Sequence, residues 1–96
     1  MIDINYELYK VFYHVASTLN FSEASKQLFI SQSAVSQSIK TLERKLDQTL
    51  FIRSTKKVQL TPEGEILMRH IEPAMNLIQK GEAQLLEAAS TGGQIR

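Results

Sequence analysis

Residues 31–46, which read SQSAVSQSIKTLERKL, combine an apolar stripe with a polar face of unusual composition. The apolar side chains recur at helical spacing, at Val35, Ile39, Leu42 and Leu46. This spacing predicts a helix that buries one side. The first acidic residue of the segment is Glu43, although solvated helix faces normally carry both signs of charge. The polar face is therefore expected to contact a partner that carboxylates would repel.

The polar face presents short hydrogen-bonding side chains first and cations further along. Its members are Gln32, Ser33, Ser36, Gln37, Lys40, Thr41 and Arg44. Glutamine can bond adenine at two positions, serine can meet most base edges, and lysine and arginine neutralise phosphate. A carboxylate at the leading end would be repelled by a phosphate backbone. The segment is therefore predicted to be a helix that reads duplex DNA.

Charge is unevenly distributed along the 96-residue chain, whose net charge is only +1. Residues 24–62 contain seven basic and two acidic residues, whereas the rest of the chain contains four basic and eight acidic ones. A basic middle between acidic ends is typical of a protein that places one face against a polyanion. Chance clustering in a short chain is the alternative interpretation.

Composition limits the class of protein. With 43% hydrophobic residues, the chain is expected to form one globular unit that is too small to enclose a cofactor, so none is expected. It contains no cysteine for a disulfide or a thiolate zinc site. It has no signal-peptide layout and no apolar run of membrane-spanning length, so a cytoplasmic protein is expected. Since metal-ligand spacings, phosphate-binding glycine loops and nucleophile elbows are also missing, an enzyme is disfavoured.

Two helices are predicted before residues 31–46, the helix that is predicted to read DNA. Residues 4–19 carry apolar side chains at three- and four-residue spacing, and the inward stripe ends at Leu19. A second helix of two turns is predicted to begin at Ser22 as its N-cap, and Ser31 is expected to cap the third. Ile30, between them, is expected to be a buried plug. Two helices joined by so short a turn must cross steeply, as in a helix-turn-helix.

A hairpin is predicted at residues 50–60. Apolar residues flank a polar and basic tip that runs from Arg53 to Lys57. Three helices followed by a basic hairpin make a winged helix-turn-helix, in which Arg53, Lys56 and Lys57 are placed to approach phosphates or the minor groove. A purely structural flap is the alternative interpretation.

A long helix is predicted after the wing, with Thr61 as its cap and Pro62 as its first residue. Its apolar seam is expected to pack against a second copy of the chain, through Leu67, Ile71, Ala74, Ile78 and Leu85. Met68 and Met75 are interpreted as adaptable packing at the same seam. Pro73 is expected to kink or split the helix.

Three motifs, FSEASKQLFISQSAVSQSIKTLE, LFIR and LTPEG, stand in an order and spacing that resemble the DNA-binding region of LysR-type transcriptional regulators. The resemblance implies a mainly α winged helix-turn-helix at residues 1–60, a linker or dimerisation helix at 61–90, and a hinge at 91–96. It also implies homodimers, tetramers of the intact protein, and partly palindromic A·T-rich operators in double-stranded DNA. A small-molecule inducer is expected only for a C-terminal domain that these residues do not include.

The resemblance also implies roles for individual residues. Those expected in the major groove are Gln32, Ser33, Ser36 and Gln37. Those expected at phosphates or in the wing are Ser22, Lys40, Thr41, Arg53, Lys56 and Lys57. Four departures from the family pattern weaken predictions of operator sequence: Ser25 replaces an alanine, Ser33 a proline and Asp47 a glycine, and the wing tip lacks glycine.

Two other interpretations stay open. A dimerisation or protein-interaction module with an incidental basic patch would also carry the long apolar seam. Another winged-helix family would share the hairpin, but it would not account for LTPEG before so long a helix. His14 and His70 are interpreted as packed or surface residues and not as ligands.

Overall fold

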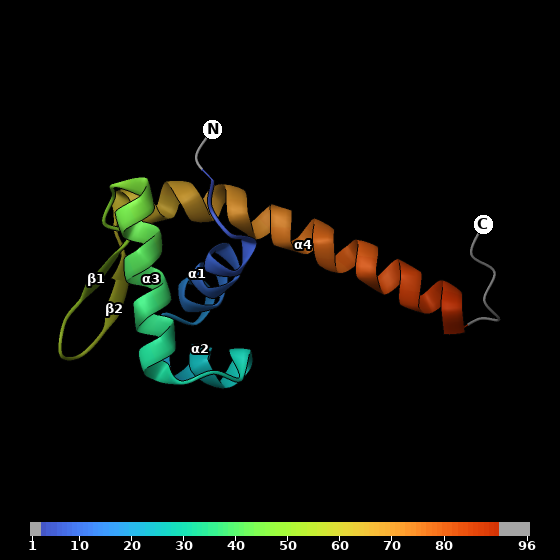
Figure 1. Cartoon of the computed structure of the whole chain (residues 1–96), viewed down its shortest axis with the longest axis horizontal. Coiled ribbons are helices and arrows are strands. Elements are labelled where there is room, and N and C mark those ends of the chain that lie inside the picture. The colour runs from blue at the N-terminus through green and yellow to red at the C-terminus, as the bar shows by residue number, and fades with distance from the viewer. Residues whose placement is uncertain (1–2, 91–96) are drawn as a thin grey trace.

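The computed structural model describes residues 3–90, and within that range the chain forms four α-helices and one two-stranded antiparallel sheet. The elements are α1 (Tyr6–Thr18), α2 (Phe21–Leu28), α3 (Gln32–Leu46), β1 (Phe51–Arg53), β2 (Val58–Leu60) and α4 (Pro62–Ser90). The first three helices pack together, the hairpin lies beside α3, and α4 extends away from this unit (Figure 1). The predicted fold, a mainly α winged helix-turn-helix followed by a long helix, is confirmed. The hinge predicted at residues 91–96 lies outside the described residues.

The core is formed by the apolar sides of α1 and α3, completed by Phe21 and Ala24 of α2 and by Leu50 and Phe51 at the start of the wing. Val35, Ile39 and Leu42 are fully buried, as the helical spacing predicts, and Leu46 packs at the edge of the same cluster. Burial of side chains of this size stabilises the fold by about 1.5–3 kcal/mol each. Because one side of α3 is held in this core, its opposite side faces solvent.

The prediction that Ser22 caps α2 is wrong. Asn20 is the N-cap, and its side-chain oxygen accepts a hydrogen bond of 2.9 Å from the backbone N–H of Glu23. The helix begins two residues earlier than expected, because Phe21 is buried in the core and an asparagine suited to capping precedes it. The hydroxyl of Ser25, which replaces the family's alanine, donates to the carbonyl of Ser22 at 2.7 Å.

Three helices end in the left-handed conformation without a glycine, at Leu19, Phe29 and Asp47. Asp47, with φ of 54°, takes the conformation that the family pattern assigns to glycine. Leu19 is 42% exposed and not inward, because the chain leaves the helix there. Ile30 is 40% exposed, so its prediction as a buried plug is also wrong. The left-handed residue before it redirects the chain, and Phe29 itself is 93% exposed.

The wing is a short hairpin in which Phe51 pairs with Leu60 and Arg53 with Val58. Ser54 closes its turn, since its backbone N–H donates to the carbonyl of Lys57 at 2.9 Å. The hydroxyl of Ser54 also accepts a hydrogen bond from the N–H of Lys57 at 3.2 Å. These contacts close the turn, and no residue of the tip takes the left-handed conformation that would favour glycine. The tip begins at Ser54, one residue later than predicted, because Arg53 is part of β1.

The start of α4 is fixed tightly to the wing. Thr61 caps the helix as predicted: its hydroxyl accepts from the N–H of Gly64 at 3.0 Å and donates to the carbonyl of Thr49 at 2.6 Å. A Cβ atom on Gly64 would collide with the carbonyl oxygen of Leu50. Glycine is therefore required at this position for the helix to lie so close to the wing.

Helix α4 is continuous through Pro73, so of the two expected effects, a kink or a split, the split is absent (Figure 1). Proline has no N–H, so Pro73 leaves the carbonyl of Arg69 without its helical partner. Because both residues are exposed, water can satisfy that carbonyl. The prediction that Met75 lies at a dimer seam is wrong, and for Met68, which is only half-buried, it stays a prediction. Met68 packs on the core of its own chain, and Met75 is buried against α1, where the hydroxyl of Tyr6 donates to its sulfur at 3.7 Å.

Candidate nucleic-acid interface

The polar face of α3 is open to solvent. Four of its predicted DNA contacts are exposed: Gln32, Ser33, Gln37 and Lys40. Ser36 is half-buried beside the wing. Within residues 3–90, no group bonds the side-chain amides of Gln32 and Gln37. Both amides therefore keep their donors and acceptors for a ligand, which is the chemistry that base edges require.

The serines at the start of α3 stabilise its first turn. Ser31 caps the helix as predicted, accepting a hydrogen bond from the N–H of Ala34 at 3.1 Å. Its hydroxyl also lies 3.3 Å from the hydroxyl of Ser33. No acidic residue lies in this first turn. No side chain of that turn therefore neutralises the positive end of the α3 dipole, where Gln32 lies.

Thr41 is less available than the resemblance implies. Its hydroxyl donates to the carbonyl of Gln37 at 2.9 Å and accepts a hydrogen bond from Arg44 at 3.3 Å. The proton that a phosphate oxygen would need is already in use within the helix. Lys40, by contrast, is exposed and is the cation nearest to the glutamines along α3.

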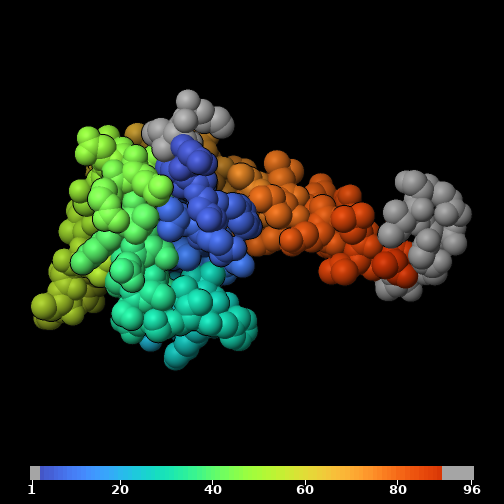
Figure 2. Space-filling model, viewed as in Figure 1, coloured from blue at the N-terminus to red at the C-terminus, as the bar shows by residue number. Residues whose placement is uncertain are grey.

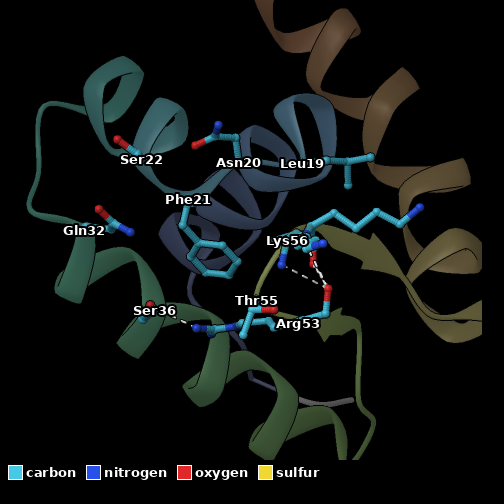
Figure 3. Close-up of a pocket in the computed structure, with 12 residues that line it drawn as sticks. Leu19, Asn20, Phe21, Ser22, Gln32, Ser36, Arg53, Thr55 and Lys56 are labelled. Carbon is cyan, nitrogen blue, oxygen red and sulfur yellow. Dashed lines mark hydrogen bonds between the residues drawn. The ribbon is translucent and has the colours of Figure 1, made fainter.

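Arg53 bridges the wing to both helices of the helix-turn-helix. Its guanidinium carbon lies 4.0 Å from the centre of the Phe21 ring, at the start of α2. Its Nη1 donates to the hydroxyl of Ser36 on α3 at 3.3 Å. Figure 3 shows Arg53 pointing from the wing to Ser36, with the Phe21 ring beside it. Arg53, Ser36 and the first turn of α2 are therefore brought together, although they are distant in sequence.

A groove of about 310 Å³ lies where the wing, α2 and α3 meet. Its lining is mostly polar and includes Ser22, Gln32, Ser36, Arg53, Lys56 and Lys57. All six are residues that the sequence analysis assigns to DNA. Nucleic-acid backbones fit open, polar and cationic grooves of this kind.

Glu43, the only acidic residue of α3, is turned away from this surface. One of its carboxylate oxygens accepts hydrogen bonds from the backbone N–H groups of Leu50 at 2.8 Å and Phe51 at 3.3 Å. The carboxylate thus fixes the entrance to the wing. The sequence analysis did not predict this role of Glu43, nor the role of Phe21. The signal for the first was a single acidic residue in the last turns of a helix that is otherwise free of acids.

The residues predicted for dimerisation fall into two groups along α4. Leu67 and Ile71 are half-buried against the core of their own chain. Ala74, Ile78 and Leu85 are exposed. In the view of Figure 2 the second half of α4 projects beyond the body of the domain.

Metal-ligand groups and membrane-spanning helices are both absent between residues 3 and 90. No group of three or more metal-ligating side chains is present in that range. None of the helices described is both long and apolar enough to cross a membrane. His14 bonds the side chain of Gln27 at 2.7 Å, and His70 is exposed on α4.

A sequence profile of the family described as bacterial regulatory helix-turn-helix protein, lysR family, matches residues 6–65, more than half of the chain. The chain belongs to the LysR family. The match runs from α1 into the first turn of α4, so it includes the whole winged helix-turn-helix of this LysR-type chain.

Relatives of this LysR-family chain include two HTH-type transcriptional regulators. It is 43% identical over 76 residues to PerR of Escherichia coli (strain K12), a match that covers 79% of this chain and 26% of PerR. It is 38% identical over 79 residues to HdfR of Yersinia enterocolitica, covering 82% of this chain and 27% of HdfR. The chain thus spans about a quarter of the length of these relatives, which are regulators and not enzymes.

Solved structures agree with the family assignment. A hydrogen peroxide-bound mutant of OxyR from Corynebacterium glutamicum matches with a TM-score of 0.79 and 29% identity, over 88% of this chain and 26% of OxyR. The DNA-binding domain of CbnR, in complex with DNA, matches with a TM-score of 0.73 and 26% identity, over 90% of this chain and 99% of that domain. The LysR-family chain therefore corresponds in extent to a domain that has been solved on DNA.

Proposed function

We propose that this chain binds double-stranded DNA sequence-specifically, with the first two turns of α3 in the major groove and the wing at the minor groove or the backbone. The observation that carries the proposal is the composition of one surface. Unbonded glutamine amides on α3 lie beside a cationic groove, and the only acid of that helix is turned inward to the wing entrance. Such a surface suits base edges flanked by phosphates.

We divide the DNA contacts into readers and anchors. The readers are Gln32, Ser33, Ser36 and Gln37, whose amides and hydroxyls can pair with base edges. The anchors are Ser22, Lys40, Arg53, Lys56 and Lys57, whose hydroxyl and cationic groups suit phosphate oxygens. Thr41 is the weakest member of the predicted set, because its hydroxyl already donates within α3.

We infer that two copies of the chain pair through α4. The second half of this helix exposes large apolar side chains, namely Leu77, Ile78, Leu85 and Leu86. An apolar row of this kind on a projecting helix is stabilised when a second chain covers it. A two-fold dimer would place two α3 helices on a partly palindromic operator. The resemblance implies that this operator is A·T-rich and that the protein acts in the cytoplasm. Tetramers and an inducer would belong to a longer LysR-type protein.

Selection of bound sequences from random duplexes tests the proposal. The expected result is two inverted half-sites whose spacing reports the dimer geometry. Affinity for the selected site should fall linearly with salt on a log–log scale, with a slope of about −0.9 per phosphate neutralised. Absent or salt-independent binding to duplex DNA would instead favour a protein-interaction module whose basic patch is incidental.

A further inference from the structure

Phe21, the first residue of α2, lies between the hydrophobic core and a cation. It is buried, and its ring meets that of Phe51 edge-on at a centroid distance of 6.2 Å. The guanidinium of Arg53 lies 4.0 Å from the centre of the same ring. The face of an aromatic ring is electronegative and attracts a cation at this distance. Phe21 therefore contacts both the core and a predicted DNA anchor.

The contact restricts a side chain that would otherwise be mobile. An arginine side chain has many rotamers, and it loses this freedom when a ligand fixes it. Here the ring of Phe21 and the hydroxyl of Ser36, 3.3 Å from Nη1, hold the guanidinium from two different helices. A side chain ordered before binding loses less entropy in the complex.

The ring holds this cation without neutralising it. Among the described residues, no carboxylate forms an ion pair with Arg53. A carboxylate partner would fix the guanidinium equally well, but it would cancel the charge that a phosphate requires. The Ser36 hydroxyl uses one of the five N–H donors of Arg53, and the others remain for an anion in the groove.

We propose that Phe21 is a positioning residue for DNA binding, which holds the guanidinium of Arg53 at the groove between the wing, α2 and α3. This inference rests on the proposed function and adds a residue that makes no contact of its own with bases. It predicts that the electrostatic character of the ring, and not only its volume, contributes to affinity.

The test replaces Phe21 with a trifluorinated phenylalanine, which keeps the shape of the ring and weakens its negative face. We expect affinity for every duplex to fall about two- to fivefold per subunit, with only a small drop in the thermal unfolding midpoint from the weakened contact. Base preference and the salt slope should also be unchanged, because the charge of Arg53 is retained. The same analogue at Phe12, which is fully buried and 5.4 Å from Phe51, is the matched control and should leave affinity unaltered.

A double-mutant cycle separates this inference from the proposed function. In the Arg53→Ala background, fluorination at Phe21 should have no further effect on affinity. If Arg53→Ala weakens binding but fluorination at Phe21 does not, or if fluorination weakens binding equally with and without Arg53, the positioning role is overturned and the DNA-binding function stands. If the unmodified chain binds no duplex at all, the proposed function itself fails.

Discussion

Glu43 and Leu50 are joined by a hydrogen bond of 2.8 Å, from the backbone N–H of Leu50 to the carboxylate of Glu43. The same oxygen accepts from the N–H of Phe51 at 3.3 Å, so α3 holds the entrance to the wing. Because Leu50 and Phe51 are buried, their N–H groups need a partner within the protein. The acid thus stabilises the fold and lies away from the proposed DNA-binding surface.

Glu43→Ala should lower the free energy of unfolding by about 1–3 kcal/mol, since two buried N–H groups lose their acceptor. Urea denaturation of the chain measures this loss. Glu43→Gln keeps an acceptor oxygen at the same position and should cost clearly less. Equal urea midpoints for wild type and Glu43→Ala would show that the carboxylate does not stabilise the wing.

Gln37→Ala should change which operators are preferred. Its amide is exposed and unbonded within residues 3–90, so it is available to pair with a base edge. Loss of a two-point contact should cost about 1–3 kcal/mol on the best site and much less on mismatched sites. Binding to a panel of single-base operator variants measures the difference. A uniform loss across the panel would reassign Gln37 to the anchors.

Arg53→Ala should weaken binding to all sequences alike. Removal of one cation at a phosphate reduces the magnitude of the salt slope by about one unit per subunit. Fluorescence anisotropy titrations at several salt concentrations, with specific and random duplexes, give both quantities. Arg53→Lys is the matched control, because it should restore the slope while losing the fork that bonds Ser36. A changed base preference in Arg53→Ala would mean that the wing reads sequence.

The elements of the domain could be predicted from sequence because their signals are local. The stripe of Val35, Ile39 and Leu42 is buried as its helical spacing requires, and Thr61 and Pro62 begin α4 as expected. The predictions for Leu19 and Ile30 failed because of backbone turns. Leu19 and Phe29 adopt the left-handed conformation, which leucine and phenylalanine rarely take, so their residue types do not predict it.

The candidate site could be predicted only in part. The exposure of Gln32 and Gln37 follows from the helical period alone. The stacking of Arg53 on Phe21 joins residues that are 32 positions apart, and it depends on how the hairpin packs on α2. Tertiary contacts of this kind have no periodic signature in the sequence. The same holds for Met75, whose apolar character fitted a dimer seam but whose partner is Tyr6 of its own chain.

Asp47→Gly should stabilise the domain. Asp47 ends α3 with φ of 54°, where an L-residue is strained, and its backbone N–H bonds the carbonyl of Arg44 at 3.2 Å. Glycine relieves the strain and keeps this bond, at some cost in chain entropy, for an expected net gain of about 0.5–1 kcal/mol. Thermal unfolding measures it. Asp47→Ala should have the opposite sign, and a destabilised glycine variant would show that the aspartate side chain stabilises the turn.

Ile78→Glu should convert dimers into monomers. Ile78 is 42% exposed in the single chain, so a carboxylate there is solvated in the monomer and leaves its helix intact. In a dimer paired along α4 the same carboxylate would be buried without a partner, which costs several kcal/mol. Sedimentation velocity measures the mass, and circular dichroism checks that helix content is unchanged. Asn76→Glu adds the same charge at an exposed position on the opposite side of α4 and should remain dimeric. An unchanged sedimenting mass for Ile78→Glu would place the interface on another surface of the chain.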